Sequence, residues 1–372
     1  MSRPRPRPRR RPRPCPRAWA VRALAVTGAA AVFALVPAAA AWAHGGHAPT
    51  ATNYRTGITG ITPDLPGVTV RAVEAGTGLE LRNRSGTTVR VLGYDGEPYL
   101  EVRPDGAYRN IHSPTTYLNA DLTGRAPVPA HADPAAEPAW QRVADAPVAR
   151  WYDHRAHWMG AGPPPRVAAD PGSPHRVLDW AVPLRAGERA GEIRGTLDWV
   201  PPPSPWPWWA GAALGAAVVA ALGLAARVRL ARVAIAVVAV GAGASALGYA
   251  VARMIDAGAA GPGEVLAWLA TGLLWQVLAG LAAVAAGTYL LVASLRSVRP
   301  SETGPVAVAV AGACLAVFAG FAEVAVFARA VAPVPFGAEW ARAGVAVALA
   351  GGVGVAAAGA LALRRLPGAR PG

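Results

Sequence analysis

The sequence predicts an exported all-β domain followed by an α-helical membrane domain, and three observations lead to this fold class. Residues 1–43 have the pattern of a secretory signal peptide, residues 44–200 hold short alternating strands, and long apolar segments follow. Hydrophobic residues make up 53% of the 372 residues and charged residues only 16%, a composition too apolar for a wholly soluble chain.

The first 43 residues show the three regions of a signal peptide. An arginine-rich start precedes an apolar run at 23–36, and Ala41-Trp42-Ala43 matches the small-residue cleavage pattern. We predict cleavage after Ala43, with an uncleaved anchor as the alternative, because 23–43 is just long enough to span a bilayer. Cleavage would make His44 the amino terminus. Its α-amine and imidazole, with the imidazole of His47, suit Cu(II); the alternative is a flexible terminus without a ligand role.

The net charge of +14 does not indicate a nucleic-acid-binding protein. Nine of the arginines lie within residues 1–43, and residues 44–205 hold 16 Arg against 17 Asp plus Glu, which leaves no basic face for phosphates. The two cysteines, Cys15 and Cys314, lie outside the exported domain, so this domain has no disulfide.

Residues 67–111 predict five antiparallel strands in succession. Apolar residues alternate with polar ones in short runs, and the runs end at turn signals such as Asp95-Gly96 and Asp105-Gly106. An Asp-Gly pair between such runs is a strong hairpin signal, because glycine adopts a positive φ easily.

A second strand pair is predicted at residues 178–199, with its turn near Ala186-Gly187. With the first set, this gives about seven strands, which predicts a β-sandwich of the immunoglobulin-like or cupredoxin-like kind. Residues 112–150, rich in Pro, Ala and Asp, are interpreted as a surface excursion, part of which packs on the sheet.

The carboxyl-terminal half predicts a five-helix transmembrane domain over residues 210–364. A Pro/Trp-rich linker at 201–209 leads into it, and a cytoplasmic tail at 365–372 ends it. The predicted spans are 210–226, 231–252, 265–295, 305–328 and 343–363.

Arginine placement predicts the orientation of these spans, since arginine collects on the cytoplasmic side. Eight arginines fall in loops on one side and three on the other: Arg227, Arg229, Arg232, Arg296, Arg299, Arg364, Arg365 and Arg370 against Arg253, Arg329 and Arg342. The β domain is therefore expected outside the plasma membrane and the carboxyl terminus inside.

Residues 151–159, WYDHRAHWM, are the densest group of metal-type ligands. His154, His157 and Met159 offer the nitrogen and thioether ligands that copper accepts, and Asp153 is the expected acceptor for an imidazole N–H. The two histidines share a face on a helical turn but point oppositely on a straight strand. The alternative is that the aromatic residues cover the core while the histidines hydrogen-bond nearby carbonyl groups.

The exported sequence has no phosphate loop, dinucleotide fingerprint or nucleophile elbow, so we predict a protein that is not an enzyme. A hydrolase built from Ser113, His154 and Asp153 is the enzymatic alternative.

In the membrane segments, Glu323 and Gln276 are the notable polar residues. An intramembrane carboxylate predicts a proton or cation relay. Pairing of Glu323 with Arg329 and Arg342 is the structural alternative. Gly211 and Gly215 form a small-residue pair typical of helix packing.

The phrases VLGYDGEPYL, SPTTYLN and WYDHRAHWM, placed between a signal peptide and carboxyl-terminal apolar segments, resemble a group of actinobacterial exported, membrane-anchored proteins. That resemblance implies the architecture and brings no activity. A terminal histidine on a β-sandwich is also similar in layout to copper-resistance proteins of the CopC type, whose membrane partners are of the CopD type. This chain departs from them because it has neither methionine-rich segments nor a histidine in the membrane.

These features predict a non-enzymatic, membrane-tethered extracytoplasmic module of a bacterial cell envelope, with copper as the candidate ligand. The alternative is an envelope scaffold or interaction module without a metal, and a third reading is an ion- or proton-translocating component. The expected partners are the lipid bilayer and either a copper ion or another envelope protein, and no nucleic acid.

Overall fold

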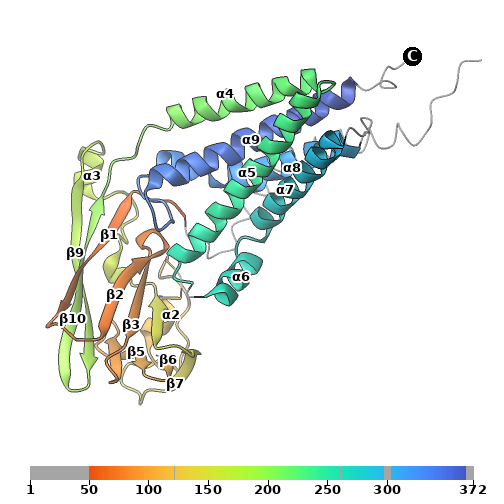
Figure 1. Cartoon of the computed structure of the whole chain (residues 1–372). Coiled ribbons are helices and arrows are strands. Elements are labelled where there is room, and N and C mark those ends of the chain that lie inside the picture. Colours follow the sequence, from red (N-terminus) through yellow and green to blue (C-terminus); the bar gives the residue numbers. More distant parts are fainter. Residues whose placement is uncertain (1–49, 121, 260, 297–302, 366–372) are drawn as a thin grey trace, which may run out of the picture.

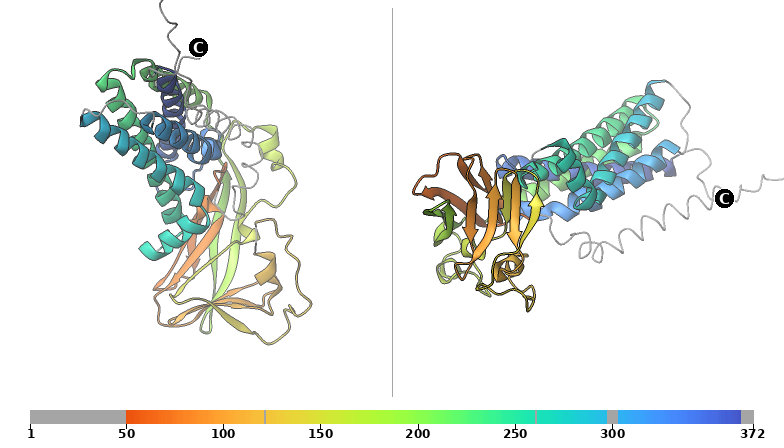
Figure 2. Two further views of the ribbon diagram at one scale, coloured as in Figure 1. Left: turned by 90° about the vertical axis from the view of Figure 1, so that its right-hand side faces the viewer. Right: turned by 90° about the horizontal axis from the view of Figure 1, so that it is seen from below.

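The computed structural model describes residues 50–120, 122–259, 261–296 and 303–365, so the predicted signal peptide, His44 and His47 lie outside the described residues. The described chain forms a β domain at one end of a bundle of long helices (Figures 1 and 2). This confirms the predicted fold class, an antiparallel β domain followed by a helical membrane domain.

Ten strands among the described residues form two antiparallel sheets. The larger sheet has the order β1-β10-β9-β4-β5-β6-β7, with β1 (Tyr54–Thr62), β10 (Arg189–Trp199), β9 (His175–Ala186), β4 (Val89–Leu92), β5 (Pro98–Arg103), β6 (Gly106–Asn110) and β7 (Trp140–Ala144). The smaller sheet has the order β2-β3-β8, with β2 (Val68–Val73), β3 (Gly78–Asn83) and β8 (Val148–Trp151).

Both sheets contribute to one apolar core. Leu81 of β3 packs in the same cluster as Val102 of β5 and Val182 of β9, and none of the three is exposed to solvent. In β4 the two valines are buried while Arg90 between them is exposed, as expected for a strand with one face on the core. The sandwich-like arrangement is therefore as predicted, although the described residues form ten strands instead of about seven.

The expectation of five strands paired in succession is wrong at one point. β3 and β4 follow each other in the chain but lie in different sheets, and β4 pairs with β9 instead. The buried Asn83 holds the crossing: its amide donates to the carbonyl oxygens of Thr87 and Val102, and its Oδ1 accepts from the N–H of Ser85. The turn signal at Ser85-Gly86 therefore marks a change of sheet.

Residues 112–150 are more ordered than predicted. They contain α2 (Pro114–Leu118), β7 and most of β8, and β8 extends the smaller sheet. Two further short elements follow, a 3₁₀ turn at His154–Ala156 and α3 (Pro165–Ala169).

Replacing Gly96 with valine is expected to destabilise the β domain by about 1 to 3 kcal/mol, because a β-branched residue is strained at positive φ. Gly96 has φ +79° in the β4–β5 turn, and a Cβ added there meets no atom within 4 Å, so the cost is conformational. Thermal unfolding of the full chain measures it. Gly162→Val is the matched control, since Gly162 has equal space and no positive φ. Equal melting temperatures for the two variants would contradict the turn assignment.

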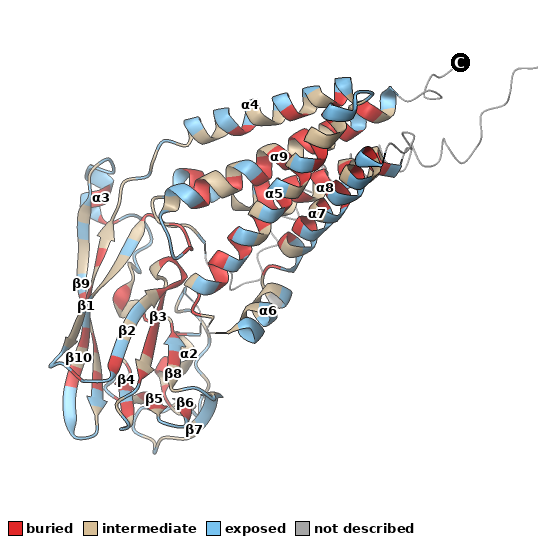
Figure 3. Cartoon of the chain, in the orientation of Figure 1, coloured by how far each residue is buried: buried red, intermediate tan, exposed pale blue. Residues whose placement is uncertain are grey.

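Five helical segments are long and apolar enough to cross a membrane: Trp206–Ala225, Arg229–Asp256, Leu274–Leu295, Thr303–Ala328 and Ala338–Arg364. They comprise α4 (Trp206–Leu222) with a 3₁₀ turn, α5 (Arg229–Asp256), α7 (Leu274–Leu295), α8 (Thr303–Leu315) with its irregular continuation, and α9 (Ala338–Arg364). Figure 3 shows buried residues gathered on the sides of α5, α7, α8 and α9 that face one another. The chain is a multi-pass membrane protein.

Two boundaries differ from the prediction. The expected span at 265–295 is divided into α6 (Pro262–Thr271) and α7, with Gly272 as the C-cap of α6. The tryptophans assigned to the linker belong to α4, and Trp208 and Trp209 pack against Phe327.

Close helix packing in the bundle depends on small residues. A Cβ at Gly243 of α5 would lie 2.7 Å from the carbonyl oxygen of Gly280 in α7, and one at Gly312 of α8 would lie 2.8 Å from that of Gly352 in α9. The expectation for α4 is half correct. Gly215 packs on Ala350, whereas Gly211 has no atom within 4 Å of an added Cβ.

Candidate functional site

The stretch 151–159 is built around Asp153, which is fully buried. Its carboxylate accepts from the indole N–H of Trp151 at 3.0 Å and binds the guanidinium of Arg155 through both oxygens at 2.8 Å. It also accepts from the main-chain N–H of Arg155, so it caps the 3₁₀ turn at His154–Ala156. Asp153 therefore neutralises a half-buried arginine and fixes the end of β8.

His154 and His157 contact different elements. The ring of His154 stacks on Tyr94 with centroids 6.4 Å apart and approaches Gly124, where an added Cβ would lie 2.8 Å from its Cε1. The Nε2 of His157 is hydrogen-bonded to the carbonyl oxygen of Thr77 at 2.8 Å. His157 lies in extended backbone as the C-cap of the turn. This contact to a main-chain carbonyl agrees with the structural interpretation of the segment.

Replacing His157 with glutamine is expected to make the folded protein less sensitive to acid. Burial lowers the pKa of His157 below 6.5, and the hydrogen bond to Thr77, which acts in the opposite direction, does not compensate. The unfolded chain therefore takes up a proton that the folded ring resists, so stability is retained above pH 6.5 and lost as the pH falls from there towards the folded pKa.

The free energy of unfolding of the full chain, followed from about pH 8 to about pH 5, measures this effect. His131→Gln, at an exposed ring, is the control. An identical pH dependence in wild type and His157→Gln would contradict the assignment.

Met159, the third predicted ligand in this stretch, and the other described histidines are placed as follows. The side chain of Met159 is exposed, and His112, His131 and His175 each bond to a carbonyl or hydroxyl oxygen. In the described ranges no three His, Cys, Asp or Glu side chains are grouped to hold a metal ion. Copper binding through His154, His157, Met159, His44 or His47 stays a prediction, which metal analysis of the exported protein with an authentic His44 terminus tests.

In the enzymatic alternative, Ser113 and Asp153 would act together with His154. In the structure Ser113 and Asp153 have other partners. The buried Ser113 donates from Oγ to Glu97 Oε1 at 2.5 Å, and Thr115 donates to the same oxygen. Asp153 is bound to Arg155, as described above. Ser113 is thus bonded to a carboxylate instead of a histidine.

The junction between the β domain and the bundle is a polar site made of three separate contacts. Thr52 and Val331 exchange two main-chain hydrogen bonds of 2.9 Å, as in an antiparallel pair. Beside them the buried Asn53 accepts from the N–H of Ala330 through its side chain and from the N–H of Val200 through its carbonyl. The segment before β1 is thereby bonded to the connection between α8 and α9.

A strained loop makes the second contact. Glu74, Ala75 and Gly76 have φ values of +56°, +58° and +89°, and the two non-glycine residues cost about 1 to 3 kcal/mol each in this region. The conformation directs the N–H of Ala75 at Asp256 Oδ2, 2.7 Å away at the end of α5. Glu74 is held by the hydroxyl of Tyr152 at 2.9 Å. The strain is offset by bonding across the junction.

The third contact is a charged network centred on the buried Glu80 of β3. Burial acts to raise the pKa of Glu80, but hydrogen bonds from Arg71 and Arg150 outweigh it and hold this pKa below its ordinary value. Arg150 also donates to the carbonyl oxygen of Gly258, just after α5, and lies 3.8 Å from Glu264 of α6. A single arginine therefore links the smaller sheet to two elements of the membrane domain.

Within the bundle, the polar residue Glu323 lies in an irregular helix. α8 passes into a π-helix at Ala316–Gly320 and then a 3₁₀ helix at Phe321–Ala328, a break often found at functional positions. Glu323 forms an ion pair with the buried Arg253 of α5. The expected pairing with Arg342 is incorrect, since Arg342 binds Glu339 and the carbonyl oxygens of Val326 and Arg329.

Gln276, the other predicted polar residue, is buried at the start of α7. Its amide donates to the carbonyl oxygen of Ala246 at 3.3 Å, so it bonds α7 to α5. A packing role accounts for this contact.

Comparisons with models of protein families, with curated proteins and with solved structures found no match to this chain.

Proposed function

We propose that this chain is a non-enzymatic, membrane-tethered scaffold of a bacterial cell envelope. In this proposal the five-helix bundle holds the β domain in one orientation outside the plasma membrane, where it binds another envelope protein. The observation that carries the proposal is the junction, at which three separate segments of the β domain bond to the membrane domain.

The three contacts are spread over different elements, and this spread favours a fixed orientation. Thr52 is bonded between α8 and α9, Ala75 at the end of α5, and Arg150 between α5 and α6. A single covalent connection through residues 201–205 would leave the β domain free to rotate about that segment. Three bonded points that do not lie on one element remove that freedom.

The ends of the helices support the orientation. The arginine-bearing ends of α4, α5, α7 and α9, at Arg227, Arg229, Arg296 and Arg364, lie away from the β domain (Figure 1). Arginine excess on that side is typical of a cytoplasmic face. The β9–β10 hairpin and the β7 edge lie away from the bundle, so they are the surfaces we assign to a partner.

Distance measurement between two spin labels tests the fixed orientation. One label at the exposed Val143 of β7 and one at the exposed Leu230 of α5, in the full chain in lipid nanodiscs, should give one narrow distance distribution. Asn53→Ala combined with Asp256→Ala should broaden it, because each of two junction contacts loses its side-chain hydrogen bond. A broad distribution in the otherwise unchanged chain would contradict the proposal.

A further inference from the structure

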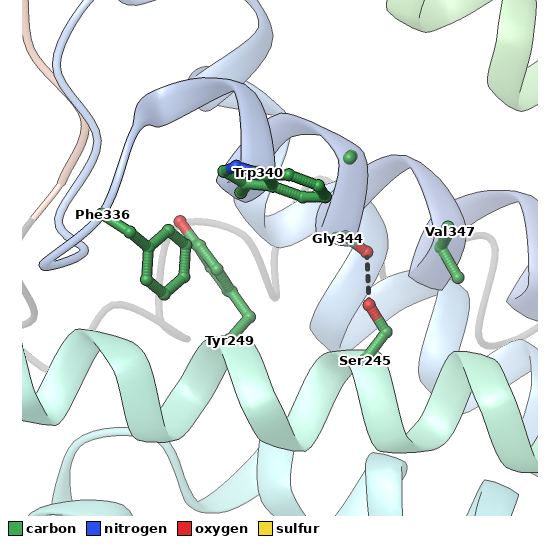
Figure 4. Close-up of a pocket in the computed structure, with 7 residues that line it drawn as sticks. Ser245, Tyr249, Phe336, Trp340, Gly344 and Val347 are labelled. Carbon is green, nitrogen blue, oxygen red and sulfur yellow. Dashed lines mark hydrogen bonds between the residues drawn. The ribbon is translucent and has the colours of Figure 1, made fainter.

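An apolar groove lies between α5 and the start of α9, with a cavity volume of about 370 Å³. Phe336, Trp340 and Val347 form its outer wall, and all three are about half exposed or more. Its floor is narrow because Ser245 Oγ donates to the carbonyl oxygen of Gly344 at 3.0 Å and draws the two helices together (Figure 4). The volume is within the range of about 300 to 1,000 Å³ that is typical of small-molecule sites.

The depth of the groove places it in the bilayer. Trp340 is in the first turn of α9, where tryptophan is typical of the membrane interface. Tyr249 precedes the end of α5 at Asp256 by seven residues, which corresponds to about 10 Å along the helix. The groove therefore extends from the headgroup region into the upper hydrocarbon.

The hydroxyl of Tyr249 is a polar atom of this groove. It has no hydrogen-bond partner within the described part of the chain. The Tyr249 side chain is 5% exposed, and its ring rises from α5 beside Phe336 with the hydroxyl towards the start of α9 (Figure 4). A buried hydroxyl without a partner is costly, so this position calls for an acceptor from outside the chain.

We propose that this groove binds an acyl chain of a membrane glycerolipid and that Tyr249 donates a hydrogen bond to the ester carbonyl of that chain. The apolar wall accepts hydrocarbon, and displacement of Phe336 brings the carbonyl to the hydroxyl. A transmembrane helix of a partner protein could also cover the apolar wall. We assign the groove to a lipid because it reaches the membrane interface at Trp340, where a glycerolipid presents a free ester carbonyl beside its acyl chain. An ester carbonyl at the head of an acyl chain meets both requirements.

Diester and diether phosphatidylglycerol with the same chains separate this proposal from non-specific lipid adsorption, since the diether lipid lacks the carbonyl. The full chain, delipidated in detergent, is titrated with each lipid and binding is followed by native mass spectrometry and thermal shift. Wild type should bind the diester about three- to tenfold more tightly, the range expected for one hydrogen bond.

Tyr249→Phe should remove this preference while leaving the lipid-free protein equally or more stable, because it deletes only the unpartnered hydroxyl. Tyr289→Phe, at an exposed tyrosine of α7, should retain the preference. Ala343→Phe, which fills the groove, should weaken binding of both lipids.

Equal affinity of wild type for the two lipids would overturn the proposal. So would retained diester preference in Tyr249→Phe. If the lipid-free chain is a dimer that Ala343→Phe dissociates, the groove is a contact between two copies and the proposal is likewise wrong.

Discussion

Replacing Arg253 with leucine is expected to destabilise the protein by about 3 to 5 kcal/mol, the usual cost of removing one partner from a buried ion pair. Arg253 is buried in α5 and binds the carboxylate of Glu323, which is mostly buried in the irregular part of α8. Without the guanidinium the mostly buried carboxylate loses this charged partner. Unfolding of the full chain in nanodiscs or mild detergent measures the loss.

The double replacement Arg253→Leu with Glu323→Leu should recover much of that stability, since two apolar residues of similar volume often substitute well for a buried pair. A single variant as stable as wild type, or a double variant less stable than the single, would show that the pair does not support the bundle.

Asp153→Ala is expected to have an effect of similar size in the β domain, about 3 to 5 kcal/mol. The variant leaves Arg155 without its carboxylate and Trp151 without its acceptor, and it removes the cap of the 3₁₀ turn. The measurement is thermal or denaturant unfolding of the full chain.

Asp145→Ala is the matched control, because Asp145 is almost fully exposed and pairs with Arg142 only at 3.4 Å. Exposed pairs of this kind contribute about 0 to 1 kcal/mol. Asp153→Asn should fall between the two, since it keeps the shape and one acceptor oxygen but loses the charge. Equal stability of Asp153→Ala and Asp145→Ala would contradict the structural role of Asp153.

Much of the β domain could be predicted because its turns depend on residues that are adjacent in the sequence. Positive φ values occur beside the strands at Gly96, Gly106 and Gly187. At the first two positions the glycine follows an aspartate, and such an Asp-Gly pair predicts a turn. β1 was missed because Gly57 and Gly60 interrupt its apolar alternation. Gly57 is nevertheless required there, since an added Cβ would lie 2.9 Å from Thr196 Oγ1 on β10.

β7 was missed for a different reason. It is an edge strand whose middle residues are exposed on both faces, so its sequence shows no period. The turn residues between β3 and β4 are the same as those of a hairpin. The difference lies in long-range contacts, such as the hydrogen bond from the Asn83 amide to the carbonyl oxygen of Val102.

The sites were less predictable than the fold because their partners are far apart in sequence. Arg253 and Glu323 are separated by 70 residues, and Ala75 and Asp256 by 181, so no local pattern joins them. Ligand-type residues are dense at 151–159, but Asp153, the most buried of them, has a structural role through its bonds to Trp151 and Arg155. The strain at Glu74 and Ala75 has no sequence signal, since neither residue is a typical left-handed one.

The central claim is that the β domain is bonded directly to the membrane domain, and a cysteine pair at Thr52 and Val331 tests it most directly. These residues form a hydrogen-bonded antiparallel pair, for which Cα atoms lie about 5.5 Å apart, within reach of a disulfide. In a Cys314→Ala background, the pair Thr52→Cys with Val331→Cys should oxidise rapidly in intact cells and resist thiol labelling. The pair Val143→Cys with Val331→Cys, which joins the β7 edge to the same loop, should stay reduced. Free, labelled thiols at positions 52 and 331 under conditions that oxidise exported cysteines would contradict the docked arrangement.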